Sequence, residues 1–306
     1  MKTLKLVPAK TEFTFIRHRL LAMGLSAALI VASLAVFAAK GLNFGIDFRG
    51  GTLIEASSAE AVNIGALRDR LGAMQLGEVQ IQEFGKETDV LIRIAEVEGA
   101  TDTSNDLSAV ERVRDELSGD YEIRRVEIVG PQVSAELIQT GLFAVFAAII
   151  SMLIYIWFRF EWQFSVGAVL ALVHDVMLTI GIFSLLQLDF NLSILAAILT
   201  IVGYSMNDTV VVYDRVRENL RKFKKMELGS LLDVAINETL SRTVMTSVTT
   251  LLALIALYML GGEVIRGFTF AMIWGVIVGT YSSVFIASPL LLILGVKRDW
   301  SGNQVD

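Results

Sequence analysis

Long apolar runs dominate the hydrophobic pattern of this chain. Six of them come close to or exceed the roughly 20 residues that a helix needs to cross about 30 Å of hydrocarbon. They cover residues 20–39, 140–158, 164–186, 192–213, 243–261 and 268–295. We therefore predict six transmembrane helices.

Residues 40–137, between the first two runs, show shorter periods that are typical of a small α+β domain. Strands are predicted at 52–57, 79–84, 90–95 and 121–128, and helices at 61–71 and 107–117. This order of elements is that of a ferredoxin-like fold. We expect an independent domain outside the membrane.

The composition agrees with a membrane protein, because 54% of the residues are apolar and the mean hydropathy is +0.61. The chain has no cysteine, which excludes disulfides. Its net charge of -6 is concentrated in residues 41–137, where acidic side chains outnumber basic ones about two to one. This acidity argues against nucleic acid as a ligand, and it also fits a merely solvated surface.

Basic residues predict the orientation, because loops rich in Lys and Arg stay in the cytoplasm. They gather in the tail 1–19, in the loop 214–242 and in the tail 297–306, at Lys2, Lys5, Lys10, Arg17, Arg19, Arg215, Arg217, Arg221, Lys222, Lys224, Lys225, Lys297 and Arg298. Both termini are then cytoplasmic, and the domain at 41–137 is periplasmic in a bacterium with two membranes. A cleaved signal peptide ending near Ala39 is the alternative, but the apolar run is longer than a signal core of about 7 to 15 residues.

Asn207 and Asp208 lie inside the fourth apolar run, which continues to Tyr213. A carboxylate in hydrocarbon costs roughly 2.5 to 3.5 kcal/mol on insertion scales, and such groups usually face a bundle interior or a wet pathway. We interpret Asp208 as a functional, proton-carrying group, with Tyr204 one helical turn away as a hydrogen-bonding neighbour. The alternative is a buried ion pair that only holds two helices together.

His174 and Asp175 lie near the middle of the third run. Histidine titrates near neutral pH, so this pair fits a proton relay, although adjacent helical residues point about 100° apart. Simple hydrogen bonding between helices explains the pair equally well.

The fifth and sixth runs carry two stripes at helical spacing. A polar stripe in the fifth run begins with a guanidinium and consists of Arg242, Thr243, Thr246, Ser247 and Thr250. We favour a polar lining over packing alone for it, because of the Arg. Small residues recur every four positions in the sixth run, at Gly267, Ala271, Gly275, Gly279 and Ser283. Such a ridge lets two helix backbones approach closely, so we predict that Gly275 and Gly279 pack against another span.

A glycine-rich segment, Gly45-Ile46-Asp47-Phe48-Arg49-Gly50-Gly51, follows the first run. It lacks the Lys and the spacing of a phosphate loop, so a nucleotide cradle is improbable. We interpret Gly45, Asp47, Gly50 and Gly51 as a hinge motif where the chain leaves the membrane. The domain after it has no nucleophilic triad or metal-ligand cluster, so we expect no enzymatic activity and no metal or cofactor, and its use should be contact with a protein or peptide.

Five motifs in order and at the right spacing resemble the SecF branch of the SecD/SecF family, whose members assist bacterial protein export. They are Gly45–Gly51, Val129-Gly130-Pro131, His174-Asp175, Tyr204-Ser205-Met206-Asn207-Asp208-Thr209 and Thr239-Leu240-Ser241-Arg242-Thr243. The SecD branch has a larger external region and a different acidic motif in the fourth span.

The resemblance implies an α-helical integral membrane protein of the bacterial inner membrane, with six transmembrane helices that form half of a resistance-nodulation-division transporter. It implies a heterodimer with SecD, association with YajC and the SecYEG channel with SecA, and the use of the proton motive force (coupling ion H+) to pull a translocating preprotein through the membrane. The family's proton-path Asp falls on Asp208 and its essential Arg on Arg242. A structural subunit that docks SecD without carrying protons is the main alternative, and half of a small-molecule or lipid exporter is another.

Overall fold

The computed structural model describes residues 8, 11–74, 76, 79–95 and 103–296. The chain divides into two compact units. The membrane unit contains residues up to Asn43, Val145–Leu188 and the chain from Ser193 onward, and the external unit contains Phe44–Ala144 with Asp189–Leu192. The predicted tail 297–306 and residues 1–7 and 9–10 of the basic N-terminal tail lie outside the described residues.

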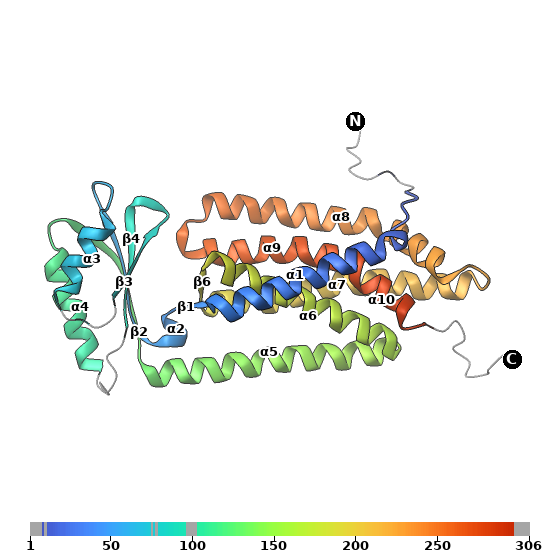
Figure 1. The fold of residues 1–306 in the computed structure, drawn as a ribbon, viewed down its shortest axis with the longest axis horizontal. Helices are drawn as coiled ribbons and strands as arrows, with labels where there is room; N and C mark the ends of the chain where they lie inside the picture. The colour runs from blue at the N-terminus through green and yellow to red at the C-terminus, as the bar shows by residue number, and fades with distance from the viewer. Residues whose placement is uncertain (1–7, 9–10, 75, 77–78, 96–102, 297–306) are drawn as a thin grey trace. The chain divides into compact units, whose positions relative to one another are not determined.

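The membrane unit confirms the prediction of six spans, so the chain is a multi-pass membrane protein (Figure 1). The first five are α1 (Arg19–Lys40), α5 (Pro131–Arg159), α6 (Trp162–Leu186), α7 (Leu192–Lys222) and α8 (Leu228–Leu260). The sixth span combines α9 (Arg266–Ser282), the π-helical turn η3 (Ser283–Ala287) and α10 (Ser288–Ile293). Short 3-10 helices precede α1 and α9, η1 (Ile16–His18) and η2 (Glu263–Ile265).

The segment 214–242, predicted as a loop, is mostly helical, because α7 runs on to Lys222 and α8 already begins at Leu228. In both helices the helical spacing of apolar residues extends beyond the predicted membrane run, after its end in α7 and before its start in α8. Val216 and Leu220 of α7 and Leu232 and Ile236 of α8 are fully buried and belong to one core cluster. A helix can accommodate the basic side chains of this segment, because its apolar stripe packs into this core while its opposite face is polar.

Burial within the membrane unit is uneven. At least half of the residues in the apolar stretches of α6, α7 and α9–α10 are buried, against 11% in those of α1, α5 and α8. Large exposed side chains such as Phe146, Trp157 and Phe158 of α5 show this best. The three inner spans therefore carry most of the buried polar side chains described in this unit, and the other three present apolar faces to lipid or to another protein.

The external unit has the predicted ferredoxin-like fold (Figure 1). Its antiparallel sheet has the strand order β3-β4-β2-β5, from β2 (Gly51–Ser58), β3 (Val79–Phe84), β4 (Lys86–Ile94) and β5 (Tyr121–Val129). Helices α3 (Ile64–Gly72) and α4 (Thr103–Leu117) supply Leu67, Leu71, Val113 and Leu117 to a core with Ile54 and Ile92 of the sheet. The first helix begins later than predicted because Asn63 caps it, accepting a hydrogen bond from the Ala66 amide at 3.1 Å.

Candidate functional site

Among the described residues of the membrane unit, two carboxylates are buried, Asp208 on α7 and Asp175 on α6. Their relative exposures are 6% and 0%. A buried charge is costly unless it is paired or hydrogen-bonded, so the side chains around each carboxylate decide what it can do.

Asp208 accepts hydrogen bonds from hydroxyl groups of two other elements. Thr243 Oγ1 of α8 lies 3.1 Å from Asp208 Oδ1, and Ser283 Oγ of η3 lies 3.4 Å from Oδ2. Both donors are buried. The carboxylate thus sits where α7, α8 and the sixth span meet.

Asp175 has a denser shell. His174 Nδ1 lies 2.9 Å from its Oδ1, while Ser205 Oγ of α7 and Ser282 Oγ of α9 donate to its Oδ2 at 2.5 and 2.8 Å. The structure therefore joins His174 and Asp175 directly, although neighbouring residues on a helix point in different directions.

Ser282 and Ser283 connect the two carboxylate sites. These consecutive residues donate to Asp175 and to Asp208 respectively. Ser283 begins the π-helical turn, whose wide i to i+5 geometry recurs at functional sites. Ser288, five residues on, donates to the Ser283 carbonyl at 2.9 Å. The π-turn helps two adjacent side chains reach carboxylates on different helices.

His174 also connects this network to α1. Its ring stacks on Tyr281 with a centroid distance of 6.1 Å. The Tyr281 hydroxyl donates to the Ala22 carbonyl of α1 at 3.0 Å and lies 3.1 Å from Ser26 Oγ. The outer span α1 is thereby linked to the buried histidine.

The predicted polar stripe of α8 divides into two faces. Thr243 and Ser247 are buried, and Ser247 Oγ lies 2.7 Å from Thr280 Oγ1 of α9. Arg242 and Thr246 are exposed, and the Thr246 hydroxyl donates to the backbone carbonyl of Arg242. Arg242 and Asp208 attract each other electrostatically.

Two other predicted neighbours of Asp208 point elsewhere. Asn207 is exposed. The buried Tyr204 hydroxyl has no hydrogen-bond partner in the described part of the chain, so it does not bond to Asp208. The residues that the sequence analysis missed are Ser205 and Ser282. Ser205 belongs to the motif Tyr204–Thr209 but was given no role there, and the signal for Ser282 is only a hydroxyl group inside an apolar span.

The glycines of the sixth span lie against α7. A Cβ atom added to Gly275 would come within 2.3 Å of Ile201 Cγ1, and one added to Gly279 within 2.9 Å of Ser205 Cβ. The close approach brings Ser205 beside the sixth span, where it shares Asp175 with Ser282.

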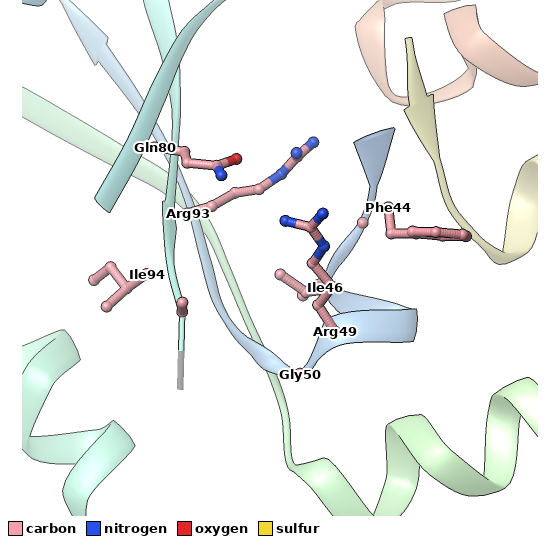
Figure 2. A pocket seen from close by; sticks show the side chains of 9 residues that line it. Phe44, Ile46, Arg49, Gly50, Gln80, Arg93 and Ile94 are labelled. Carbon is pink, nitrogen blue, oxygen red and sulfur yellow. The ribbon is translucent and has the colours of Figure 1, made fainter. Parts of the chain in front are cut away.

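The Gly45–Gly51 motif belongs to the external unit and contains a one-turn helix, α2 (Ile46–Arg49). Gly50 and Gly51 follow it with φ of 74° and 108°, values that favour glycine, and turn the chain into β2. Asp47 accepts a hydrogen bond from the Leu192 amide at 2.9 Å. Near this motif, Phe44, Ile46, Arg49, Gln80 and Arg93 line a small pocket (Figure 2).

The membrane site offers carboxylates and hydroxyl groups, which hold and pass protons. A carboxyl group gains or loses one proton, and a hydroxyl group both donates and accepts a hydrogen bond. Among the described residues no cluster of His, Cys, Asp and Glu has the arrangement of a metal site.

Comparison with known proteins identifies two family models that match this chain. Protein export membrane protein SecD/SecF, C-terminal, matches residues 109–297, and the SecD/SecF GG motif matches residues 35–62. The chain is 48% identical to protein translocase subunit SecF of Rhodobacter capsulatus, over 97% of this chain and 93% of that protein. It is 44% identical to the subunit of the same name from Rickettsia rickettsii, over 99% and 98%.

The fold is similar to a crystal structure of SecDF, a translocon-associated membrane protein, from Thermus thermophilus. The TM-score is 0.85 and the sequence identity 35%. The match covers 94% of this chain and 39% of that chain.

Proposed function

Because the chain belongs to the SecD/SecF family of protein export membrane proteins and matches SecF members along nearly their whole length, we propose that it promotes protein export by coupling proton movement to movement of its external unit. The observation that carries this proposal is Asp208, a carboxyl group buried among hydroxyl groups inside a membrane-spanning helix. A subunit that only docks its partners has no need of so costly a group.

The effect of protonating Asp208 follows from the hydrogen bonds that its two forms can make. Ionised Asp208 accepts from both Thr243 and Ser283, whereas protonated Asp208 carries a hydrogen that must itself be donated. One of the two hydroxyls then has to turn. Ser283 already has a second acceptor, the Thr280 carbonyl at 3.0 Å. Protonation thus shifts the Ser283 bond towards its own helix and loosens α7 from the sixth span.

The second carboxylate transmits this change. When the bond between Ser283 and Asp208 is lost, the sixth span becomes free to shift against α7, and the adjacent Ser282, which is bound to Asp175, shifts with this span. Asp175 in turn holds His174 and Ser205, so α6 and α7 respond together. In this role His174 and Asp175 form the inner part of the proton pathway.

Arg242 acts from the outer face of α8. It is exposed in this chain, one residue before Thr243, and attracts Asp208 electrostatically. We propose that SecD covers this face of α8 when the two subunits form a heterodimer. Burial beneath a partner strengthens the attraction because the local dielectric falls. Arg242 then favours the ionised form of Asp208, and its withdrawal favours proton uptake.

The complex extends to the export channel. We propose that the protein associates with YajC and with the SecYEG channel and SecA, and that it acts on a translocating preprotein. The coupling ion in this proposal is H+, and no other cofactor takes part. The protein then resides in the bacterial inner membrane with both termini cytoplasmic and residues 41–137 in the periplasm, since Arg215, Arg221 and Lys222 gather at the α7–α8 hairpin.

The test replaces Asp208 by Asn, which preserves shape but cannot exchange a proton. We expect Asp208→Asn to assemble with SecD and to lose the part of preprotein export that depends on a proton gradient in reconstituted vesicles. The matched control is Asp214→Asn on the same helix, whose carboxylate forms a half-exposed ion pair with Arg159, and it should keep this export. Full gradient-dependent export by Asp208→Asn would reject proton coupling and support a docking role.

A further inference from the structure

The first turn of α7 is capped by a residue that lies 145 positions earlier in the chain. Asp47 Oδ2 accepts the Leu192 amide hydrogen at 2.9 Å. The first amide groups of a helix have no partner within it, and a carboxylate there also interacts favourably with the helix dipole. Asp47 therefore stabilises the start of the helix that carries Asp208.

Asp189 begins the two-residue strand β6 (Asp189–Phe190) and is held by the sheet of the external unit. Arg93 of β4 forms an ion pair with it, and Gln82 Nε2 of β3 donates to its Oδ2 at 3.2 Å. Arg93 is buried. Figure 2 shows its side chain extending from the sheet into the pocket that α2 borders.

Phe190 and Asn191, between Asp189 and Leu192, contact the Gly45–Gly51 motif and the adjacent Phe44. The Gly45 amide donates to the Phe190 carbonyl at 2.8 Å, and a Cβ atom on Gly45 would lie 3.2 Å from Asn191 Cβ. The Phe190 ring lies 5.9 Å from the rings of both Phe44 and Phe48. Every residue of 189–192 thus contacts other residues of the external unit, to which this segment belongs.

We propose that Asp47, Gly45 and Arg93 form a joint with residues 189–192 that fixes the start of α7 to the external unit. Asp208 lies 16 residues further along the same helix, about 24 Å at roughly 1.5 Å per residue. This inference rests on the proposed proton coupling. A movement of α7 set off at Asp208 then reaches the external unit along one continuous helix rather than through span one alone. Asp47 is a positioning residue in this scheme.

The first test compares two substitutions of Asp47. Asn is also a good cap because its amide oxygen accepts a hydrogen bond, whereas Ala has no acceptor. We expect Asp47→Ala to lose most gradient-dependent export and Asp47→Asn to keep more than half of it. Asp69→Ala, a change of an exposed carboxylate on α3, should behave as the wild type.

The second test closes the joint covalently. The chain has no native cysteine, and Gly45 has φ of -70°, which a cysteine adopts without strain. The Cβ separation of 3.2 Å from Asn191 is close to the 3.5–4.5 Å typical of a disulfide. In Gly45→Cys/Asn191→Cys, we expect oxidation to leave export intact. In the triple variant with Asp47→Ala, oxidation should restore export and reduction should remove it again.

The outcomes separate this inference from the proposed function. Unchanged export by Asp47→Ala overturns the joint, as does failure of the oxidised disulfide to restore it. Loss of export when the disulfide closes beside native Asp47 also overturns it, because the joint would then have to open. Full export by Asp208→Asn rejects proton coupling itself, whatever the Asp47 variants do.

Discussion

Thr243 on α8 donates a hydrogen bond of 3.1 Å to Oδ1 of Asp208 on α7. The two residues are 35 positions apart in the chain and both are buried. Helices in a membrane gain little from apolar contact with each other, so polar contacts of this kind carry specificity between spans. The bond also makes the state of Asp208 depend on the position of α8.

Replacing Thr243 by Val tests this dependence. Valine has nearly the same shape but no hydroxyl, so Asp208 loses one of its two donors. A hydrogen bond to a charged group contributes about 1.5 kcal/mol, and we expect gradient-dependent export to fall roughly tenfold with assembly intact. Export is measured in vesicles with and without a proton gradient.

Thr246→Val is the matched control on the same helix. Its hydroxyl bonds to the Arg242 carbonyl and the side chain is exposed. Its export should stay close to that of the wild type. Equal losses in both variants would mean that the bond to Asp208 has no special role.

The contact of Gly275 and Gly279 with α7 leads to a second prediction. A methyl group on either glycine meets Ile201 or Ser205 well inside van der Waals distance. Overpacking of this kind costs about 1–3 kcal/mol. We expect Gly275→Ala and Gly279→Ala to lower the melting temperature of the purified protein in detergent.

Gly24→Ala on α1 is the control for the glycine substitutions. A Cβ atom there meets nothing within 4 Å, and alanine favours a helix more than glycine does. This variant should be as stable as the wild type or slightly more stable. If Gly275→Ala and Gly279→Ala melt like Gly24→Ala, the ridge is not a tight interface.

A third prediction concerns the pH dependence of the external unit, expressed as residues 41–137. Its own apolar core supports folding in isolation. Within it Asp89 is buried and accepts hydrogen bonds from Ser57 at 2.5 Å and from Arg124 at 3.0 Å. The hydrogen bond from Ser57, together with the attraction of Arg124, lowers the pKa of Asp89 below its ordinary value.

Because the pKa of Asp89 is lower in the folded state, its carboxylate contributes to stability at neutral pH and loses this contribution in acid. The carboxylate stabilises the fold fully above the unfolded pKa of about 3.9, and this contribution disappears as the pH falls through the lower folded value. At pH 7 we expect Asp89→Asn to reduce the free energy of unfolding by about 1.5–3 kcal/mol, as for a hydrogen bond to a charged group. Urea unfolding should show the difference from the wild type shrinking from pH 5 to pH 2. A difference that does not change with pH would contradict this account.

The sequence by itself determined the six spans and the ferredoxin-like order of the external unit. Both depend on local patterns, since the length of an apolar run sets a span and the alternation of residues sets a strand. The same local pattern made Asp208 stand out, because a carboxylate in an apolar run is costly wherever its neighbours lie. The boundaries of α7 and α8 were less accurate, because Val216 and Ile236 belong to a buried core that extends beyond the apolar runs.

Only the tertiary structure decided which side chains meet the carboxylates. Adjacent helical residues point about 100° apart, so the sequence could not tell whether Thr243 or Arg242 faces Asp208. The answer depends on how each helix is rotated about its axis, and in the structure α8 turns Thr243 towards Asp208 and leaves Arg242 exposed. The capping of Leu192 by Asp47 was equally hidden, because a helix cap supplied from 145 residues away leaves no local pattern.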